Sequence, residues 1–393
     1  MKAKTLKLCF PVIAITVQNN GAWLIIPPFL QSLNFPVSSI GYLVSLFPVL
    51  SLVSRIPAGM VYKQSRARML ITVAILIMGV CNFFYSLATD SVTFALVHGI
   101  NGFLYGAVTT LYMAFYVDSL PPDENRTHAM GYYVGSLAVG YSTGSFLAGY
   151  VADRFGYDVG FYVSAFLSLV CLALFFLLRD SSSAKEKKTQ ATHIRLRDSL
   201  KAALDPNMAE VVVVALFLNF LNQLGGVFLP LYGLAVGMTL TQVGVIRAFY
   251  SLCNAVTRPL SGYVVTRFGY HRLSYGGMSL QSALMMVVPL FTDFGTVLAL
   301  YISAGFMRAV AVVSNAVALV KDVDETKVPR GVASGIYNAA GDLGNILGPS
   351  VGGLIAATTG IGGLFVFAPL GATALFFIVV WGLKLRASSL TMQ

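Results

Sequence analysis

The sequence predicts an all-α membrane protein in which twelve transmembrane helices form two parallel, pseudo-symmetric bundles of six. Three observations predict this fold. Hydrophobic residues make up 56% of the 393 residues and charged residues only 11%, which is more apolar surface than a soluble core uses. Apolar runs of about 20 residues, the length of helix that crosses a bilayer, fill nearly the whole chain. The second half of the chain also repeats the first.

Each apolar run predicts one helix, because lipid offers the backbone no hydrogen-bond partner and a helix satisfies its own peptide groups. Short loops join most of the runs. In chain order the predicted spans are 8–32, 39–62, 69–88, 92–117, 128–152, 159–178, 209–234, 241–265, 273–291, 295–320, 331–356 and 363–384.

The first run follows Lys2, Lys4 and Lys7, a pattern that also begins secretion signals. It extends to Leu33 without an Ala-x-Ala-like cleavage site, so we expect a retained first helix.

The only long polar stretch is 179–207, which contains three consecutive serines and several Lys and Arg residues. It predicts a linker between an N-terminal bundle, 1–178, and a C-terminal bundle, 208–393. The alternative for its second part, 194–204, is an amphipathic helix on the inner leaflet of the membrane.

The net charge of +10 indicates the orientation of the protein rather than a nucleic-acid partner. Nearly all of the 26 Lys and Arg residues fall in loops on one side of the predicted membrane. The exceptions are Arg154 in an opposite loop and Arg55, Arg247, Arg258 and Arg308 within spans. Basic loops stay in the cytoplasm, so both termini and the linker are expected there. Chain length and short loops favour a bacterial inner (plasma) membrane.

The internal repeat is visible in residues that apolar sequence would not conserve by chance. A shift of 203 positions places Asn19 on Asn222, Pro27 on Pro230, Gly41 on Gly244, Arg55 on Arg258 and Gly59 on Gly262. From the fourth helix a shift of 204 places Asp118 on Asp322, Arg126 on Arg330, and Gly131, Gly140, Gly144, Gly149 and Gly156 on Gly335, Gly344, Gly348, Gly353 and Gly360. The chain is therefore predicted to be two six-helix halves of parallel topology.

With two such halves, the chain resembles the major facilitator superfamily over all twelve helices. The resemblance implies two bundles around a central cavity that opens alternately to either side of the membrane. The loop motif of the family between helices 2 and 3 is partly kept, with Gly59, Lys63 and Arg66, but Lys63 replaces the acidic residue. The matching loop of the second half, with Gly262 and Arg267, also lacks the acid. These five residues belong to the two loops that are expected to gate the cavity.

A second motif lies on the eleventh predicted helix, where Gly344, Gly348, Pro349, Gly352 and Gly353 recur at short spacing. It resembles the motif that antiporters of the family carry on helix 5, where this chain has glycines but no proline. The motif favours export by antiport, and close helix packing is the equal alternative.

Polar residues inside the spans are expensive unless they face protein or water, so they indicate the lining of a wet cavity. Several share one helical face, for example Asn338, Asp342 and Asn345, or Arg308 and Asn315. Tyrosines in this set are equally consistent with packing. The residues predicted to bind solute are Asn19, Asn20, Asn101, Tyr105, Tyr112, Asn222, Gln223, Arg247, Arg308, Asn338 and Asp342.

Arg308 and Asp342 lie near the middle of consecutive spans and are predicted to pair. A carboxylate whose ionisation depends on a neighbouring arginine is able to carry a coupling proton. The alternative is a fixed structural salt bridge.

Together these features predict a secondary active transporter of a small organic solute, preferably one that exports it by proton antiport. One alternative is proton-coupled uptake of an anionic metabolite or metal chelate, and another is a non-transporting receptor. The sequence has no Walker loop, no nucleophile elbow and no paired Cys or His cluster. We therefore expect neither an ATP-driven pump nor an enzyme, and we expect no bound cofactor or metal. The expected partners are the solute, protons and the lipid bilayer, with the protein a monomer.

Overall fold

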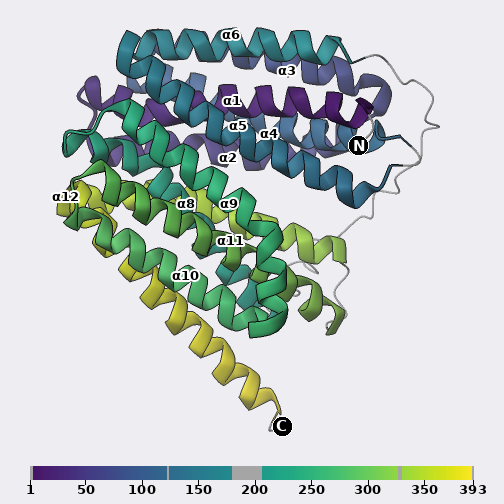
Figure 1. Ribbon diagram of the computed structural model, residues 1–393, viewed down its shortest axis with the longest axis vertical. Coiled ribbons are helices and arrows are strands. Elements are labelled where there is room, and N and C mark those ends of the chain that lie inside the picture. The colour runs from purple at the N-terminus through teal and green to yellow at the C-terminus, as the bar shows by residue number, and fades with distance from the viewer. Residues whose placement is uncertain (1–2, 122–123, 179–205, 326–329, 392–393) are drawn as a thin grey trace. The chain divides into compact units, whose positions relative to one another are not determined.

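The computed structural model describes residues 3–121, 124–178, 206–325 and 330–391, and within these ranges it is helical without a β-strand (Figure 1). The first half contains α1 (Ala3–Ser32), α2 (Val37–Val61), α3 (Gln64–Phe84), η1 (Tyr85–Leu87), α4 (Ser91–Asp118), α5 (Arg126–Phe155) and α6 (Tyr157–Phe176). The second half contains α8 (Pro206–Ala235), α9 (Leu240–Phe268), α10 (Tyr270–Val287), η2 (Val288–Leu290), α11 (Phe294–Glu325) and α12 (Arg330–Thr391).

Helix length and hydropathy support the predicted membrane protein. Among the described residues, eight stretches of helix are long and apolar enough to cross a membrane. Helices α5, α9 and α10 are not among them, because glycine, serine, tyrosine and basic residues lower their hydropathy. The all-α membrane fold is therefore confirmed, whereas the number of twelve spans stays a prediction.

The chain divides into two compact units, Met1–Thr189 with Leu229–Leu252, and Gln190–Phe228 with Cys253–Gln393. In the first unit α1 packs against α5 and α6, α2 against α4, and α3 against α4 and α6 (Figure 1). In the second unit α10 packs against α11 and α12. The predicted boundaries at 178 and 208 stay a prediction, because nearly all of the linker 179–207 lies outside the described residues.

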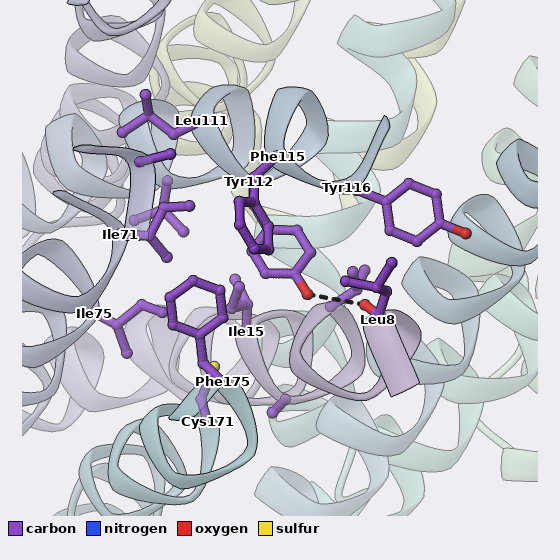
Figure 2. Close-up of a cluster of buried hydrophobic side chains, with 14 of the residues drawn as sticks. Leu8, Ile15, Ile71, Ile75, Leu111, Tyr112, Phe115, Tyr116, Cys171 and Phe175 are labelled. Carbon is purple, nitrogen blue, oxygen red and sulfur yellow. Dashed lines mark hydrogen bonds between the residues drawn. The ribbon is translucent and has the colours of Figure 1, made fainter. Parts of the chain in front are cut away.

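One hydrophobic cluster of the first unit is formed mainly by residues of α1, α3, α4 and α6 (Figure 2). Aromatic rings from two of these helices meet edge to face, with the centroids of Phe115 and Phe175 5.5 Å apart. Tyr112 belongs to the same cluster: it is 1% exposed, and its hydroxyl donates a hydrogen bond of 2.9 Å to the carbonyl of Leu8. The side chain of Tyr112 therefore packs the bundle in this structure, and its predicted contact with solute stays a prediction.

Helix α12 consists of two helices that meet at Gly360, where φ is +75°. Gly156 separates α5 from α6 in the same way, with φ of +87°. This left-handed region suits glycine because a Cβ atom would clash with the backbone. The two glycines are matched by the 204-residue shift, so the two parts of α12 correspond to α5 and α6.

The same helix contact also occurs twice. On α5, a Cβ atom at Gly144 would lie 2.7 Å from the carbonyl oxygen of Val17 in α1. On α12, a Cβ atom at Gly348 would lie 2.8 Å from the carbonyl oxygen of Phe220 in α8. Val17 and Phe220 differ by 203 positions, the shift of the sequence repeat. The structure thus confirms the repeat at the level of individual contacts, with glycine allowing two backbones to touch.

Two matched aspartates begin matched helices. The carboxylate of Asp90 accepts hydrogen bonds of 3.0 Å from the backbone nitrogens of Val92 and Thr93 at the start of α4. Asp293, which is 203 positions later, accepts one of 2.7 Å from the backbone nitrogen of Thr296 at the start of α11. Such N-caps satisfy backbone donors that the first turn of a helix leaves unpaired.

We predict that Gly348→Ala lowers the free energy of unfolding by about 1–3 kcal/mol, because the added methyl group meets backbone rather than a movable side chain. Gly335 lies on the same helix with nothing within 4 Å of its Cβ position. Gly335→Ala is the control and should be neutral or stabilising by at most about 1 kcal/mol. Denaturant titration in detergent measures both; equal effects of the two variants would contradict the close contact.

The caps also predict a response to acid. The pKa of the Asp90 carboxyl group lies below its ordinary value, mainly because the side chain of Thr93 hydrogen-bonds to it. The pKa of the Asp293 carboxyl group is also lowered, mainly by the hydrogen bond from the backbone of Thr296. A lowered pKa stabilises the fold above the unfolded value of about 4, and this contribution is lost as the pH falls through the folded value.

The double variant Asp90→Asn with Asp293→Asn keeps the caps without the charges. The wild type should therefore melt at a higher temperature than this variant at pH 7, and the difference should vanish in acid. An unchanged difference across the acid range would show that the two charges do not contribute.

Candidate transport site

The polar face of α11 lies against α8 in the second unit. Arg308, which is 6% exposed, donates from Nη1 to the carbonyl of Leu218 and from Nη2 to Oδ1 of Asn219, the latter at 3.1 Å. Asn315, seven residues further along α11, donates a hydrogen bond of 3.1 Å to the carbonyl of Val211, seven residues before Leu218. These two polar side chains, which lie two turns apart on α11, thus attach this helix to the backbone of α8.

Asn219 is a site residue that our sequence analysis missed. Its Oδ1 accepts from Arg308, and its Nδ2 donates a hydrogen bond of 2.9 Å to the carbonyl of Ala215 on its own helix. A Cβ atom at Gly341 of α12 would lie 2.9 Å from the same nitrogen. The available signal was its position on α8, one turn before the predicted pair Asn222 and Gln223.

The polar face of α12 contributes Asp342, which directly follows Gly341 and is 7% exposed. On the same face Asn338 is exposed and Asn345 is half-buried. Tyr337, one residue before Asn338, hydrogen-bonds to Asn315 of α11. Asp342 therefore lies beside the region where α8, α11 and α12 meet, and its predicted ion pair with Arg308 stays a prediction.

The predicted pair on α8 is half-buried at both positions, Asn222 and Gln223. Gln223 lies at the close contact with α12, where its Cβ atom is 3.1 Å from the Cβ position of Gly348. Part of this pair therefore borders the helix contact itself.

In the first unit, three predicted residues lie between α1, α4 and α5. Asn20 donates hydrogen bonds to the carbonyl of Tyr141 at 2.8 Å and to the hydroxyl of Ser145 at 2.6 Å. The hydroxyl groups of Tyr105 and Tyr141 are 3.3 Å apart. Asn19 is buried beside Asn20. The amide and phenol groups of this cluster can donate and accept hydrogen bonds with a polar solute.

Asn101 takes part in a buried hydrogen-bond chain. Its Nδ2 donates to Oδ1 of Asn82 and to the hydroxyl of Tyr85, both at 3.1 Å. The hydroxyl of Tyr85 lies 2.8 Å from Nδ1 of His98, whose Nε2 lies 3.3 Å from the carbonyl of Val44. His98 is thus packed and hydrogen-bonded, and the chain of bonds joins α2, α3 and α4.

Arg247 is 8% exposed, and its guanidinium lies 5.4 Å from the ring centroid of Tyr250. A cation over an aromatic face gains electrostatic stabilisation when water is excluded. Both residues belong to the first unit. The site of this predicted cation is therefore aromatic as well as buried.

The predicted gating residues lie near helix ends. Gly59, Lys63, Arg66 and Arg267 are exposed and Gly262 is half-buried, with open space at both glycines. Their proposed gating role stays a prediction.

Next to Lys63, the hydroxyl of Tyr62 donates a hydrogen bond of 2.7 Å to Oδ2 of Asp118. This bond links the ends of α2 and α4 beside the loop that lacks the acidic residue of the family motif.

Within the described residues, no group of three or more His, Cys, Asp or Glu side chains is arranged to hold a metal ion. Among the described residues, the buried polar side chains are amides, hydroxyls, the imidazole of His98, the guanidinium groups of Arg247 and Arg308, and the carboxylate of Asp342. These groups can bind and orient a solute and exchange a proton.

Comparison with known proteins agrees with this architecture. The family model described as Major Facilitator Superfamily matches residues 8–324 and again residues 211–390. An MFS-type transporter of Methanocaldococcus jannaschii is 22% identical over 90% of this chain and 89% of its own length. Multidrug resistance protein 2 of Bacillus subtilis is 23% identical over 84% and 83%.

Among solved structures, the nucleoside transporter NupG has a TM-score of 0.79 at 16% identity, covering 98% of this chain and 99% of that one. A bacterial homolog of the human lysosomal transporter Spinster has a TM-score of 0.77 at 14% identity, covering 98% and 96%. At these identities the structures show a shared fold. Since the family model matches nearly the whole sequence, the chain belongs to the major facilitator superfamily.

Proposed function

We propose that this protein is a secondary active transporter that exports a small organic solute by alternating access in exchange for protons. In this mechanism the binding site opens to one side of the membrane at a time. We place it as a monomer in the bacterial plasma membrane with both termini in the cytoplasm. The family supports transport, and the name of the Bacillus subtilis relative favours export.

The observation that carries the proposal is a difference between two halves that otherwise repeat each other. Applying the 204-residue shift, the positions of Arg308 and Asp342 are occupied in the first half by Leu104 and Ala138. The first half nevertheless forms the same glycine contact between its first and fifth helices. That contact therefore forms without an arginine and an aspartate at these positions, which favours a functional role over a purely structural one.

Asp342 is suited to couple protons to the solute. A buried carboxyl group changes from neutral to charged when it releases its proton, and the charged form is costly away from water unless a cation or hydrogen bonds stabilise it. Any movement that changes its surroundings must then change its proton affinity. The same linkage requires that protonation shifts the balance between conformations.

A second candidate is proton-coupled uptake of an anionic metabolite or a metal chelate. Among the described residues, the buried charged side chains are Arg247, Arg308 and Asp342, so cations outnumber the anion. An excess of buried positive charge favours an anionic solute. The direction of flux under a pH gradient separates this candidate from export, and the absence of flux would favour a receptor.

The experiment reconstitutes the purified protein into vesicles and imposes a pH gradient of either sign. Three labelled probes represent an aromatic cation, a nucleoside and an aromatic anion: ethidium, uridine and benzenesulfonate, which stays charged across the working pH range. We expect one of them to accumulate against its own concentration gradient, and only while the pH gradient lasts. No accumulation of any probe, together with no probe binding, would contradict the transporter proposal.

We further predict that Asp342→Asn removes accumulation driven by the pH gradient, to the level of empty vesicles, because an amide cannot bind the coupling proton. Exchange of labelled for unlabelled solute at equal pH should persist, since it needs no net proton movement. Asp293→Asn is the control: it makes the same substitution at an exposed helix cap and should leave accumulation unchanged. Full accumulation by the Asp342 variant would exclude this residue as the proton carrier.

A further inference from the structure

Four helices of the first unit are joined in a closed circle of side-chain contacts. The ring of Trp23 in α1 meets that of Phe47 in α2, with centroids 5.2 Å apart, and Phe47 meets Tyr105 of α4 at 5.4 Å. The hydroxyl of Tyr105 lies 3.3 Å from that of Tyr141 in α5, and Asn20 of α1 donates a hydrogen bond to the carbonyl of Tyr141. We call these five residues the first-unit cluster. Aromatic rings form one side of it and polar groups the other.

The amides of α1 keep hydrogen-bonding capacity at this cluster. Asn20 uses both hydrogens of Nδ2, on the carbonyl of Tyr141 and the hydroxyl of Ser145, and among the described residues no group donates to its Oδ1. Asn19 is only 9% exposed, yet its side-chain amide forms no hydrogen bond within the described part of the chain. It lies one turn before Trp23, on the same face of α1. A donor and two acceptors of these amides are therefore available to a bound molecule.

The two tyrosines add a further donor. Both side chains, Tyr105 and Tyr141, are half-buried, so part of each remains accessible. Their hydroxyl groups share one hydrogen bond, which uses the hydrogen of one of them. The hydrogen of the other hydroxyl can be donated to a bound molecule.

The fixed charges of the first unit are unfavourable for a cationic solute. Tyr105 lies within the electrostatic influence of Arg55 from α2, and Arg247 is buried in the same unit. Among the described residues, the only buried acidic side chain is Asp342, which belongs to the second unit. A charged group leaves water at high cost unless opposite charge or hydrogen bonds replace its hydration. The amides and phenols of the cluster therefore suit an uncharged solute better than a cation.

Building on the proposed function, we infer that the first-unit cluster binds an uncharged, planar heteroaromatic solute, with its ring against Phe47 and Tyr105 and its polar edge on Asn19 and Asn20. Aromatic side chains provide faces and edges on which a flat ring packs. A side-chain amide offers a donor and an acceptor side by side, which matches a heterocycle that carries an acceptor next to a donor. The rings and the amides thus select for the same class of molecule.

The test measures binding to the full-length protein in detergent by equilibrium dialysis of four labelled probes. Uridine and adenosine are uncharged heteroaromatic solutes, whereas ethidium and benzenesulfonate are aromatic ions of opposite sign. We expect uridine or adenosine to bind at least tenfold more tightly than either ion.

A built-in reporter locates the bound ring. The chain contains two tryptophans, Trp23 in the cluster and Trp381, which is 68% exposed on α12. The variant Trp381→Phe leaves Trp23 as the only source of tryptophan fluorescence. A solute ring against Phe47 lies close to Trp23, so binding should change the emission of this variant.

Two substitutions test the two sides of the cluster. Asn19→Ala should weaken binding of the heteroaromatic probe about tenfold, the usual effect of losing one or two hydrogen bonds. Phe47→Leu keeps an apolar side chain but removes the ring, and should weaken binding about three- to tenfold. Phe103→Leu is the matched control, because Phe103 is exposed on α4, and it should leave binding unchanged. Asn19→Leu, which has nearly the same shape without polar atoms, replaces Asn19→Ala if the latter does not fold.

Tight binding of a heteroaromatic probe that changes Trp23 emission and weakens in both variants supports the inference. Tighter binding of ethidium or benzenesulfonate, binding of none of the four probes, or unchanged affinity in both folded variants would overturn it. The binding assay needs no pH gradient, so its outcome is separate from the proposed function. Accumulation of an ion without heteroaromatic binding contradicts only the solute class, whereas heteroaromatic binding without accumulation of any probe contradicts only transport.

Discussion

A single buried cation constrains the arrangement of the second unit. Moving a guanidinium group out of water costs several kcal/mol unless hydrogen bonds replace those it loses. Arg308 obtains them from α8, at Leu218 and Asn219, which requires α11 to lie against that helix with its polar face inward. Gly341 of α12 also lies close to Asn219, since a Cβ atom there would be 2.9 Å from the amide nitrogen of Asn219. The cation thus links α11 to α8 through neutral groups.

The duplication explains which features belong to the scaffold and which do not. Matched glycines allow α5 to touch α1 and α12 to touch α8, and matched aspartates cap α4 and α11. Gly156 and Gly360 break the chain at equivalent points. Against this shared frame, the buried charged side chains of the described residues, Arg247, Arg308 and Asp342, all lie in the second half of the sequence. They therefore distinguish two otherwise similar halves.

The fold was predictable because its signals are local or periodic. Span length, apolar runs and the offset between repeated glycines can all be counted along the chain, and even the break at Gly360 follows from its match with Gly156. The site was less predictable. Tyr105 and Tyr112 share one face of α4, yet one hydroxyl faces Tyr141 and the other is enclosed in the core against Leu8. Helical spacing specifies a face but not the neighbour that covers it. Asn219 lies one turn before Asn222, yet this spacing does not show that Arg308 of α11 and Gly341 of α12 come close to it.

In the proposed exchange, solute and proton compete through the ionisation of Asp342. The pH of a weakly buffered protein solution is recorded while a probe that the wild type binds is added. We expect binding to release about one proton per protein in the wild type and none in Asp342→Asn, by the reciprocity of linked equilibria. Binding of the probe without any proton release in the wild type would contradict it.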